Sequence, residues 1–120
     1  MARAFETFEV YQLATVLTAK IFKLLNQEKF KKEFEFSNQL KRATLSITNN
    51  IAEGCEYNTN AQFIRFLNYA KGSCGEVRNM LNLCNLLYNE DTALLIEDCK
   101  VVSKQLAKFC EYLAKSDHNK

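Results

Sequence analysis

The stretch QLKRATLSITNNIAEG, from Gln39 to Gly54, carries two neighbouring rows of side chains when it is read as an α-helix. At 3.6 residues per turn one row is apolar and the row beside it is polar. The apolar row contains Phe36, Leu40, Ala43, Ile47 and Ile51, and the polar row contains Gln39, Ser46, Asn50 and Glu53. The polar row would lie at the edge of a helix–helix contact, where an unpaired buried polar group costs about 1–3 kcal/mol. The stretch therefore predicts a second helix that supplies complementary polar groups.

The rest of the chain also favours helices. Its 120 residues include no Pro and only three Gly, the two residue types that most often interrupt helices. Four segments have helical periodicity, and we expect helices at about residues 6–26, 36–53, 60–88 and 91–114. The charged segment 27–35 is expected to be the longest connection. These features predict an all-α fold, an antiparallel up-down-up-down four-helix bundle, in a single domain over residues 1–120.

Two local signals bear on the helix ends. Gly54 is expected to end the second helix, because glycine is the residue best suited to the left-handed conformation that follows a helix. Thr59 and Gln62 have the spacing of a capping box, in which each side chain satisfies a backbone N–H at the start of the third helix.

The third helix has a wider apolar arc than one bundle core normally uses. A second row lies beside its core stripe, and it indicates either unusual burial or a contact with another subunit. The candidate subunit-interface residues in this row are Phe66, Tyr69, Met80 and Leu87. Gly72 and Gly75 lie in the middle of the same helix, where each costs about 0.5–1 kcal/mol relative to Ala. Close approach of another backbone is one plausible compensation.

The cysteines and the single histidine do not predict a metal site. The five Cys lack Cys-x-x-Cys spacing, and His118 lies in the polar tail, so we expect neither a metal nor another cofactor. Four Cys fall on or near apolar helix faces, where reduced Cys acts as a small hydrophobic residue. Cys55, just past a predicted helix end, is expected to be the exposed thiol.

The polar row has possible partners on the third helix, namely Arg65, Asn68 and Glu76. One interpretation is a hydrogen-bonded network that fixes the register of the two helices. A catalytic carboxylate pair of Glu53 and Glu76 is an alternative, and a role in ligand binding or assembly is another. Phosphate-loop, dinucleotide-binding and nucleophile-elbow motifs are absent, so the sequence favours a protein that is not an enzyme.

Basic residues form two concentrations that could contact the phosphates of RNA or DNA. The candidate contacts are Lys29, Lys31, Lys32, Lys41 and Arg42 in the first, and Lys100, Lys104 and Lys108 in the second. The alternative is an ordinary solvated helix face, which the interleaved Glu97 and Glu111 favour. The formal net charge of +2 demands neither a nucleic acid nor a membrane surface as partner.

Two motifs resemble the bacterial four helix bundle family, also called 23S ribosomal RNA intervening-sequence proteins. The first is SITNNIAEG at residues 46–54, where the family usually has Ser-Ile-Pro-Ala-Asn-Ile-Ala-Glu-Gly, so that Thr48 and Asn49 replace Pro and Ala. The second is FIRFLNYAKGSCGEV at residues 63–77, which carries the family pattern Arg-Phe-Leu-Asn-x-Ala-Arg/Lys-Gly-Ser-x-x-Glu. The resemblance extends over about residues 5–115.

The resemblance implies a small non-enzymatic protein that assembles as a homopentameric ring. Accessory proteins of diversity-generating retroelements are similar, and they form basic, barrel-like pentamers that bind nucleic acid and a reverse transcriptase. We therefore expect an oligomer that binds RNA or DNA through basic surfaces, or alternatively a protein–protein scaffold or accessory subunit of a partner enzyme such as a reverse transcriptase. No apolar run approaches the roughly 20 residues of a membrane span, so we expect a cytoplasmic protein without a membrane partner.

Overall fold

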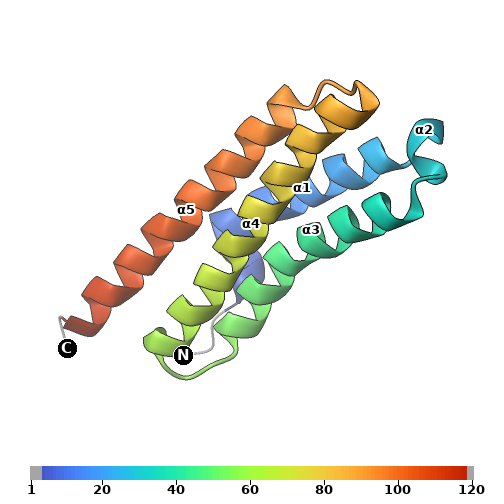
Figure 1. The fold of residues 1–120 in the computed structure, drawn as a ribbon. Helices are drawn as coiled ribbons and strands as arrows, with labels where there is room; N and C mark the ends of the chain where they lie inside the picture. The colour runs from blue at the N-terminus through green and yellow to red at the C-terminus, as the bar shows by residue number, and fades with distance from the viewer. Residues whose placement is uncertain (1–3, 119–120) are drawn as a thin grey trace.

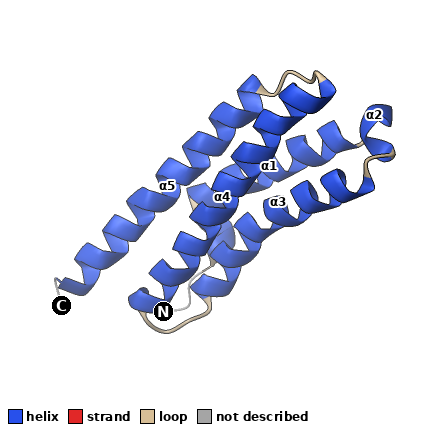
Figure 2. Cartoon of the chain, in the orientation of Figure 1, coloured by secondary structure: helices blue, strands red, loops and turns tan. Residues whose placement is uncertain are grey.

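A computed structural model of the protein describes residues 4–118 and places nearly all of them in helices (Figures 1 and 2). The elements are a 3-10 helix, η1 (Phe5–Thr7), and five α-helices, α1 (Glu9–Leu25), α2 (Glu28–Lys31), α3 (Phe34–Cys55), α4 (Asn60–Tyr88) and α5 (Ala93–His118). The four long helices alternate in direction along the chain and form a rod of 53 × 20 × 20 Å (Figure 1). The predicted all-α helical bundle is confirmed.

The four long helices are arranged in the order α1, α3, α4, α5 around the bundle axis. α3 contacts α1 and α4, α4 contacts α3 and α5, and α1 and α5 complete the ring. α1 has 17 residues, whereas α4 and α5 have 29 and 26. The short α1 therefore covers only part of the length of α4 and α5 (Figure 1).

The core contains the apolar stripes of all four long helices, as helical periodicity predicts. In α3, Leu40, Ala43, Ile47 and Ile51 are buried, while Phe36 is half-buried at the edge. The largest fully buried side chains are Phe30, Phe63, Leu17, Ile21, Leu40, Ile47, Ile51, Leu67, Leu81, Leu106, Val77 and Val102.

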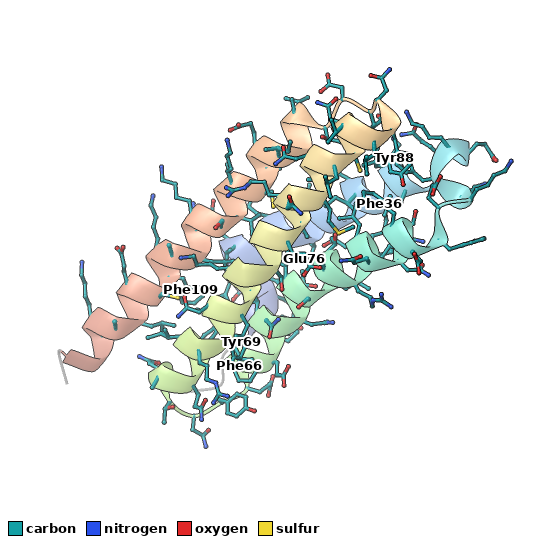
Figure 3. The ribbon with its side chains drawn as sticks, viewed as in Figure 1. Phe36, Phe66, Tyr69, Glu76, Tyr88 and Phe109 are labelled. Carbon is teal, nitrogen blue, oxygen red and sulfur yellow. The ribbon has the colours of Figure 1, made fainter. Side chains whose placement is uncertain are left out.

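Aromatic rings close the bundle at both ends (Figure 3). Near the start of α4, Phe63 contacts Phe8 and Phe109, with ring centroids 6.1 and 5.2 Å away. At the other end Tyr88 contacts Phe30, which is completely buried. The sequence predicted residues 27–35 as a connection, but this segment contains the short helix α2. The helix places the buried Phe30 ring over the end of the core.

Gly54 does not end α3 in the left-handed conformation, so that prediction is wrong. The helix continues to Cys55, and the described glycines all have negative φ. A Cβ atom at Gly54 would lie 2.6 Å from Cβ of Phe66, which means that α3 and α4 approach each other closely at this residue. The same continuation buries Cys55, whose exposure is 6%, and so contradicts its expected exposure.

The other helix ends match the predictions or differ from them by a few residues. The Thr59 hydroxyl accepts a hydrogen bond from the backbone N–H of Gln62 at 3.2 Å, as expected for one half of the capping box. α4 then spans the residues expected for the third helix. α5 starts at Ala93, and the buried Thr92 just before it donates its hydroxyl to the carbonyl oxygen of Leu81 at 2.7 Å. α5 also runs to His118, beyond the end predicted at residue 114, while residues 119–120 of the expected tail lie outside the described residues.

Candidate functional site

The polar row of α3 meets α4 at one short hydrogen-bonded contact. Ser46 Oγ accepts hydrogen bonds from Asn50 Nδ2 at 3.0 Å and from Ser73 Oγ at 2.9 Å. Ser73 Oγ also lies 3.2 Å from the Tyr69 carbonyl oxygen, and Asn50 Nδ2 lies 2.8 Å from the Ser46 carbonyl oxygen. The Ser46–Ser73 hydrogen bond links α3 to α4 at this level of the bundle. Sequence reasoning missed Ser73 as a polar partner because it lies within the second apolar row of the third predicted helix.

The other residues of the predicted network do not join this contact. Gln39, Glu53 and Glu76 are exposed, and among residues 4–118 no hydrogen bond or ion pair links Glu53 to Glu76. The row is on the outer edge of the α3–α4 contact, so long side chains there extend into water. This arrangement gives no support for the carboxylate pair considered from the sequence.

Arg65 and Asn68 of α4 also lie away from the Ser46 contact. Arg65 Nε donates to the Tyr69 hydroxyl at 2.8 Å, and this hydrogen bond raises the pKa of the guanidinium. Asn68 instead faces α5, where its side-chain oxygen lies 3.9 Å from Cys110 Sγ. The predicted network is thus divided among three separate places on α4.

An exposed aromatic cluster lies where α3 ends and α4 begins, and we define it as Tyr57, Phe66 and Tyr69. The Tyr57 and Phe66 rings are stacked with centroids 5.0 Å apart, and the Tyr69 ring meets Phe66 edge-on at 5.5 Å. Tyr57 and Tyr69 remain 42% and 47% exposed. Figure 3 shows Phe66 and Tyr69 together at this end of α4. Sequence reasoning missed Tyr57, since its place in a turn gives no helical periodicity.

The four candidate interface residues of α4 do not form one continuous surface. Met80 is only 4% exposed and belongs to the core of the chain itself, which excludes it from a surface contact in this fold. Leu87 is 59% exposed and lies at the opposite end of α4 from Phe66 and Tyr69.

Three of the candidate nucleic-acid contacts form ion pairs within the chain. Lys29 Nζ lies 2.6 Å from a Glu90 oxygen, Lys31 lies 3.1 Å from Glu28, and Lys100 lies 3.3 Å from Glu97. These pairs reduce the charge that the lysines offer to phosphates.

The remaining five candidates are divided between distant parts of the fold. Lys41 lies over the Phe22 ring at 5.6 Å, and it is followed on α3 by the exposed Arg42. Lys32 lies just after α2, whereas Lys104 and Lys108 are exposed on α5. Within residues 4–118, Lys32, Arg42, Lys104 and Lys108 have no ion-pair partner. A single chain therefore offers two small basic areas.

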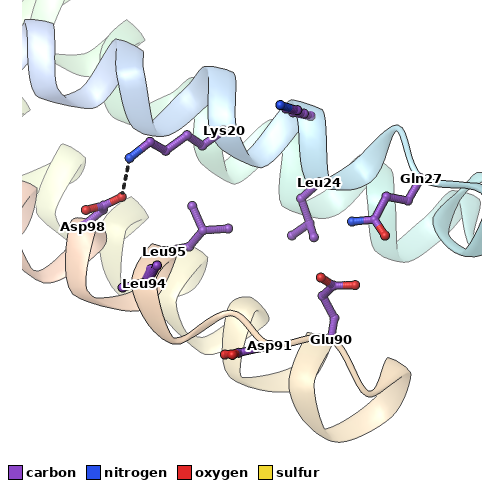
Figure 4. A pocket seen from close by; sticks show the side chains of 9 residues that line it. Lys20, Leu24, Gln27, Glu90, Asp91, Leu94, Leu95 and Asp98 are labelled. Carbon is purple, nitrogen blue, oxygen red and sulfur yellow. Dashed lines mark hydrogen bonds and ion pairs between the residues drawn. The ribbon is translucent and has the colours of Figure 1, made fainter.

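A cavity of about 600 Å³ lies between the C-terminal half of α1 and the start of α5 (Figure 4). Leu24 and Leu95 form part of its apolar wall, and Leu94 at its rim is 83% exposed. Lys20 crosses one end of the cavity to an ion pair with Asp98 at 3.0 Å. No nucleophile with an adjacent base lines this cavity, so its chemistry suits contact with another molecule better than catalysis.

The part of the chain that the structure describes shows neither a metal-binding cluster nor a helix that could span a membrane. Among the side chains that the structure describes, those of residues 4–116, no group of three His, Cys, Asp or Glu could hold a metal ion. No described helix has the length and apolarity that crossing a membrane requires.

Comparisons with known proteins agree with this architecture. The chain is similar to a crystal structure from Bacteroides thetaiotaomicron, described as a protein with unknown function from the S23 ribosomal protein family. The two are 26% identical, with a TM-score of 0.77 over 84% of this chain and 97% of that one. No curated protein matches the chain. The description of the Bacteroides protein names no enzymatic activity. A family model described as "23S rRNA-intervening sequence protein" matches residues 6–108, and the chain therefore belongs to this family.

Proposed function

We propose that the protein is a non-enzymatic helical bundle that self-associates and, once assembled, binds RNA or DNA through repeated basic surfaces. The observation that carries this proposal is the exposed aromatic cluster beside the α3–α4 contact. Tyrosine and phenylalanine are enriched at protein interfaces, because they bury large apolar areas at a small cost in conformational entropy. A ring of five copies, as the family resemblance implies, is the assembly we propose.

Assembly would also bring together basic residues that are divided between two areas in one chain. In one chain only a few candidate lysines and arginines are without ion pairs, and they lie in two areas. Each phosphate contact adds a salt-dependent increment of affinity, and linked copies convert several weak contacts into one strong one. Repetition of Lys104 and Lys108 around a ring would thus supply a basic surface that a single chain lacks.

Changing Tyr69 to Glu is expected to disrupt the assembly. A charge in a desolvated contact is costly, so we expect the association constant to fall at least tenfold, equivalent to about 1.4 kcal/mol. Light scattering after size-exclusion chromatography measures the mass, and circular dichroism checks that helix content is unchanged. Tyr112→Glu is the matched control, since Tyr112 is 65% exposed on α5, outside the cluster. Equal masses for wild type and Tyr69→Glu would refute the role of the cluster.

Neutralising Lys104 and Lys108 together is expected to weaken binding to duplex DNA and to RNA. For duplex DNA the slope of log K against log salt should become smaller by about 0.9 for each lost phosphate contact. Gel shifts across a salt series measure this slope. The control is Lys20→Gln, because Lys20 is paired with Asp98 and is not among the candidate contacts. An unchanged slope in the double variant would show that α5 does not contact phosphates.

A partner-protein scaffold is the second candidate function, and one observation favours it. Leu86, Leu87 and Leu94 are 78%, 59% and 83% exposed, where α4 ends and α5 begins. Such apolar residues could contact a partner enzyme, for example a reverse transcriptase. Capture of that enzyme by the wild-type protein after nuclease treatment, with loss of capture in a Leu86→Ser, Leu94→Ser variant, would favour this function over nucleic-acid binding.

A further inference from the structure

Two buried cysteines face each other between α4 and α5. Cys74 and Cys99 are each 1% exposed, and Cys99 Sγ lies 3.2 Å from the carbonyl oxygen of Cys74. Each of the two thiols shifts the pKa of the other. They are both reduced, and their sulfurs are neighbours across a helix–helix contact.

A small pocket reaches this pair from the surface. Its volume is about 170 Å³, and it is lined by Lys71, Cys74, Gly75, Arg78, Cys99 and Ser103. Gly75 adds no side chain to the wall, and a Cβ atom there would have no neighbour within 4 Å. A reagent as small as a peroxide can therefore approach the two sulfurs without unfolding the helices.

The surroundings favour ionisation of one of the two thiols. The neighbouring Cys74 side chain lowers the pKa of the Cys99 thiol, and the positive charge of Arg78 acts in the same direction against the effect of burial. The neighbouring Cys99 side chain raises the pKa of the Cys74 thiol, with burial as the next cause. Since the thiolate is the reactive form of cysteine, Cys99 is the attacking sulfur and Cys74 the resolving one.

We propose that Cys74 and Cys99 form an oxidant-reactive dithiol, a site of reversible covalent modification that links α4 to α5 as a disulfide. The Cys99 thiolate attacks one oxygen of a peroxide, the O–O bond breaks, and hydroxide leaves and is protonated to water while the sulfur becomes a sulfenic acid. The Cys74 sulfur then attacks the Cys99 sulfur, the S–S bond forms, and the S–O bond breaks. The hydroxyl group leaves with the Cys74 proton as a second water, so two electrons pass from the thiols to the peroxide.

Cys99 differs in this respect from Cys84 and Cys110. Cys84 is completely buried, and burial raises the pKa of its thiol to about 11. Cys110 is half-buried, and burial raises the pKa of its thiol as well. These environments disfavour the thiolate, so oxidation is expected to start at Cys99 rather than at Cys84 or Cys110.

Treatment of the folded protein with a small excess of hydrogen peroxide tests the proposal. We expect loss of two of the five thiols, loss of two hydrogen atoms in the intact mass, and one disulfide-linked peptide pair containing Cys74 and Cys99. A thiol reductant should restore all five thiols. Cys99→Ala should abolish this product, whereas Cys84→Ala should leave it unchanged.

Phenylarsine oxide, which bridges two neighbouring thiols, provides a second measurement that needs no variant. One equivalent should bind the wild-type protein and protect Cys74 and Cys99 together from alkylation. Retention of all five thiols under peroxide, or oxidation of other cysteines in their place, would overturn the proposal. None of these results depends on assembly or on nucleic-acid binding.

Discussion

Replacing Phe63 with Ala is expected to lower the free energy of unfolding by about 3–5 kcal/mol, the range for removing a buried aromatic side chain. The Phe63 ring is completely buried and touches Phe8 and Phe109, so it joins the N-terminal segment, α4 and α5 at one end of the bundle. Loss of the ring would leave a cavity. The three helical segments around it cannot all move inward to fill it. Urea denaturation followed by circular dichroism measures the change.

Phe34→Ala is the control for this substitution. Phe34 is 71% exposed at the start of α3, so its removal should change stability by less than about 0.5 kcal/mol. A similar small change for Phe63→Ala would contradict the packing described for this end of the bundle.

Replacing Gly54 with Ala is expected to lower the free energy of unfolding by about 1–3 kcal/mol, the usual cost of adding atoms to a close-packed contact. The new Cβ would lie 2.6 Å from Cβ of Phe66 and 3.1 Å from the Phe63 ring. Because Cβ of Phe66 is fixed to the α4 backbone, relief requires a shift of one helix against the other. The sign of the change in stability is informative, since Ala in an ordinary helix position stabilises the helix by about 0.5–1 kcal/mol relative to Gly.

Gly72→Ala is the matched control, in the same chain and in the middle of α4. A Cβ atom there would have no neighbour within 4 Å, so this variant should be more stable by about 0.5–1 kcal/mol. Stabilisation by Gly54→Ala as well would mean that α3 and α4 are farther apart than described. Dissociation of an assembly by Gly72→Ala, with the chain still folded, would indicate that a neighbouring subunit approaches this glycine.

Helical periodicity made the fold predictable because it depends only on residues near one another in sequence. Leu40, Ile47 and Ile51 are buried for the reason the sequence indicated, that they share one face of a helix. The role of Gly54 was predicted wrongly, because glycine occurs both at helix ends and at close contacts between helices. Only the relative position of α3 and α4 decides between these uses. α2 was missed for a related reason, since the burial of Phe30 is a tertiary effect in a short charged segment.

The candidate site was predicted less well than the fold. Ser46 and Asn50 do take part in a polar contact, but their partner Ser73 is a short side chain that periodicity placed in an apolar row. The wide apolar arc of α4 contains both a buried residue, Met80, and an exposed one, Tyr69. A row that is uniform in sequence is thus divided between core and surface in the fold. Periodicity alone cannot locate the boundary between core and interface.

The mass of the wild-type protein in solution tests the central claim, self-association, most directly. Light scattering after size-exclusion chromatography, repeated over a range of protein concentrations, measures this mass without a label or a partner. We predict a multiple of the 13.9 kDa chain mass, with five copies as the expected assembly. A mass of 13.9 kDa at every concentration would contradict the claim, because the aromatic cluster would then be exposed in a monomer.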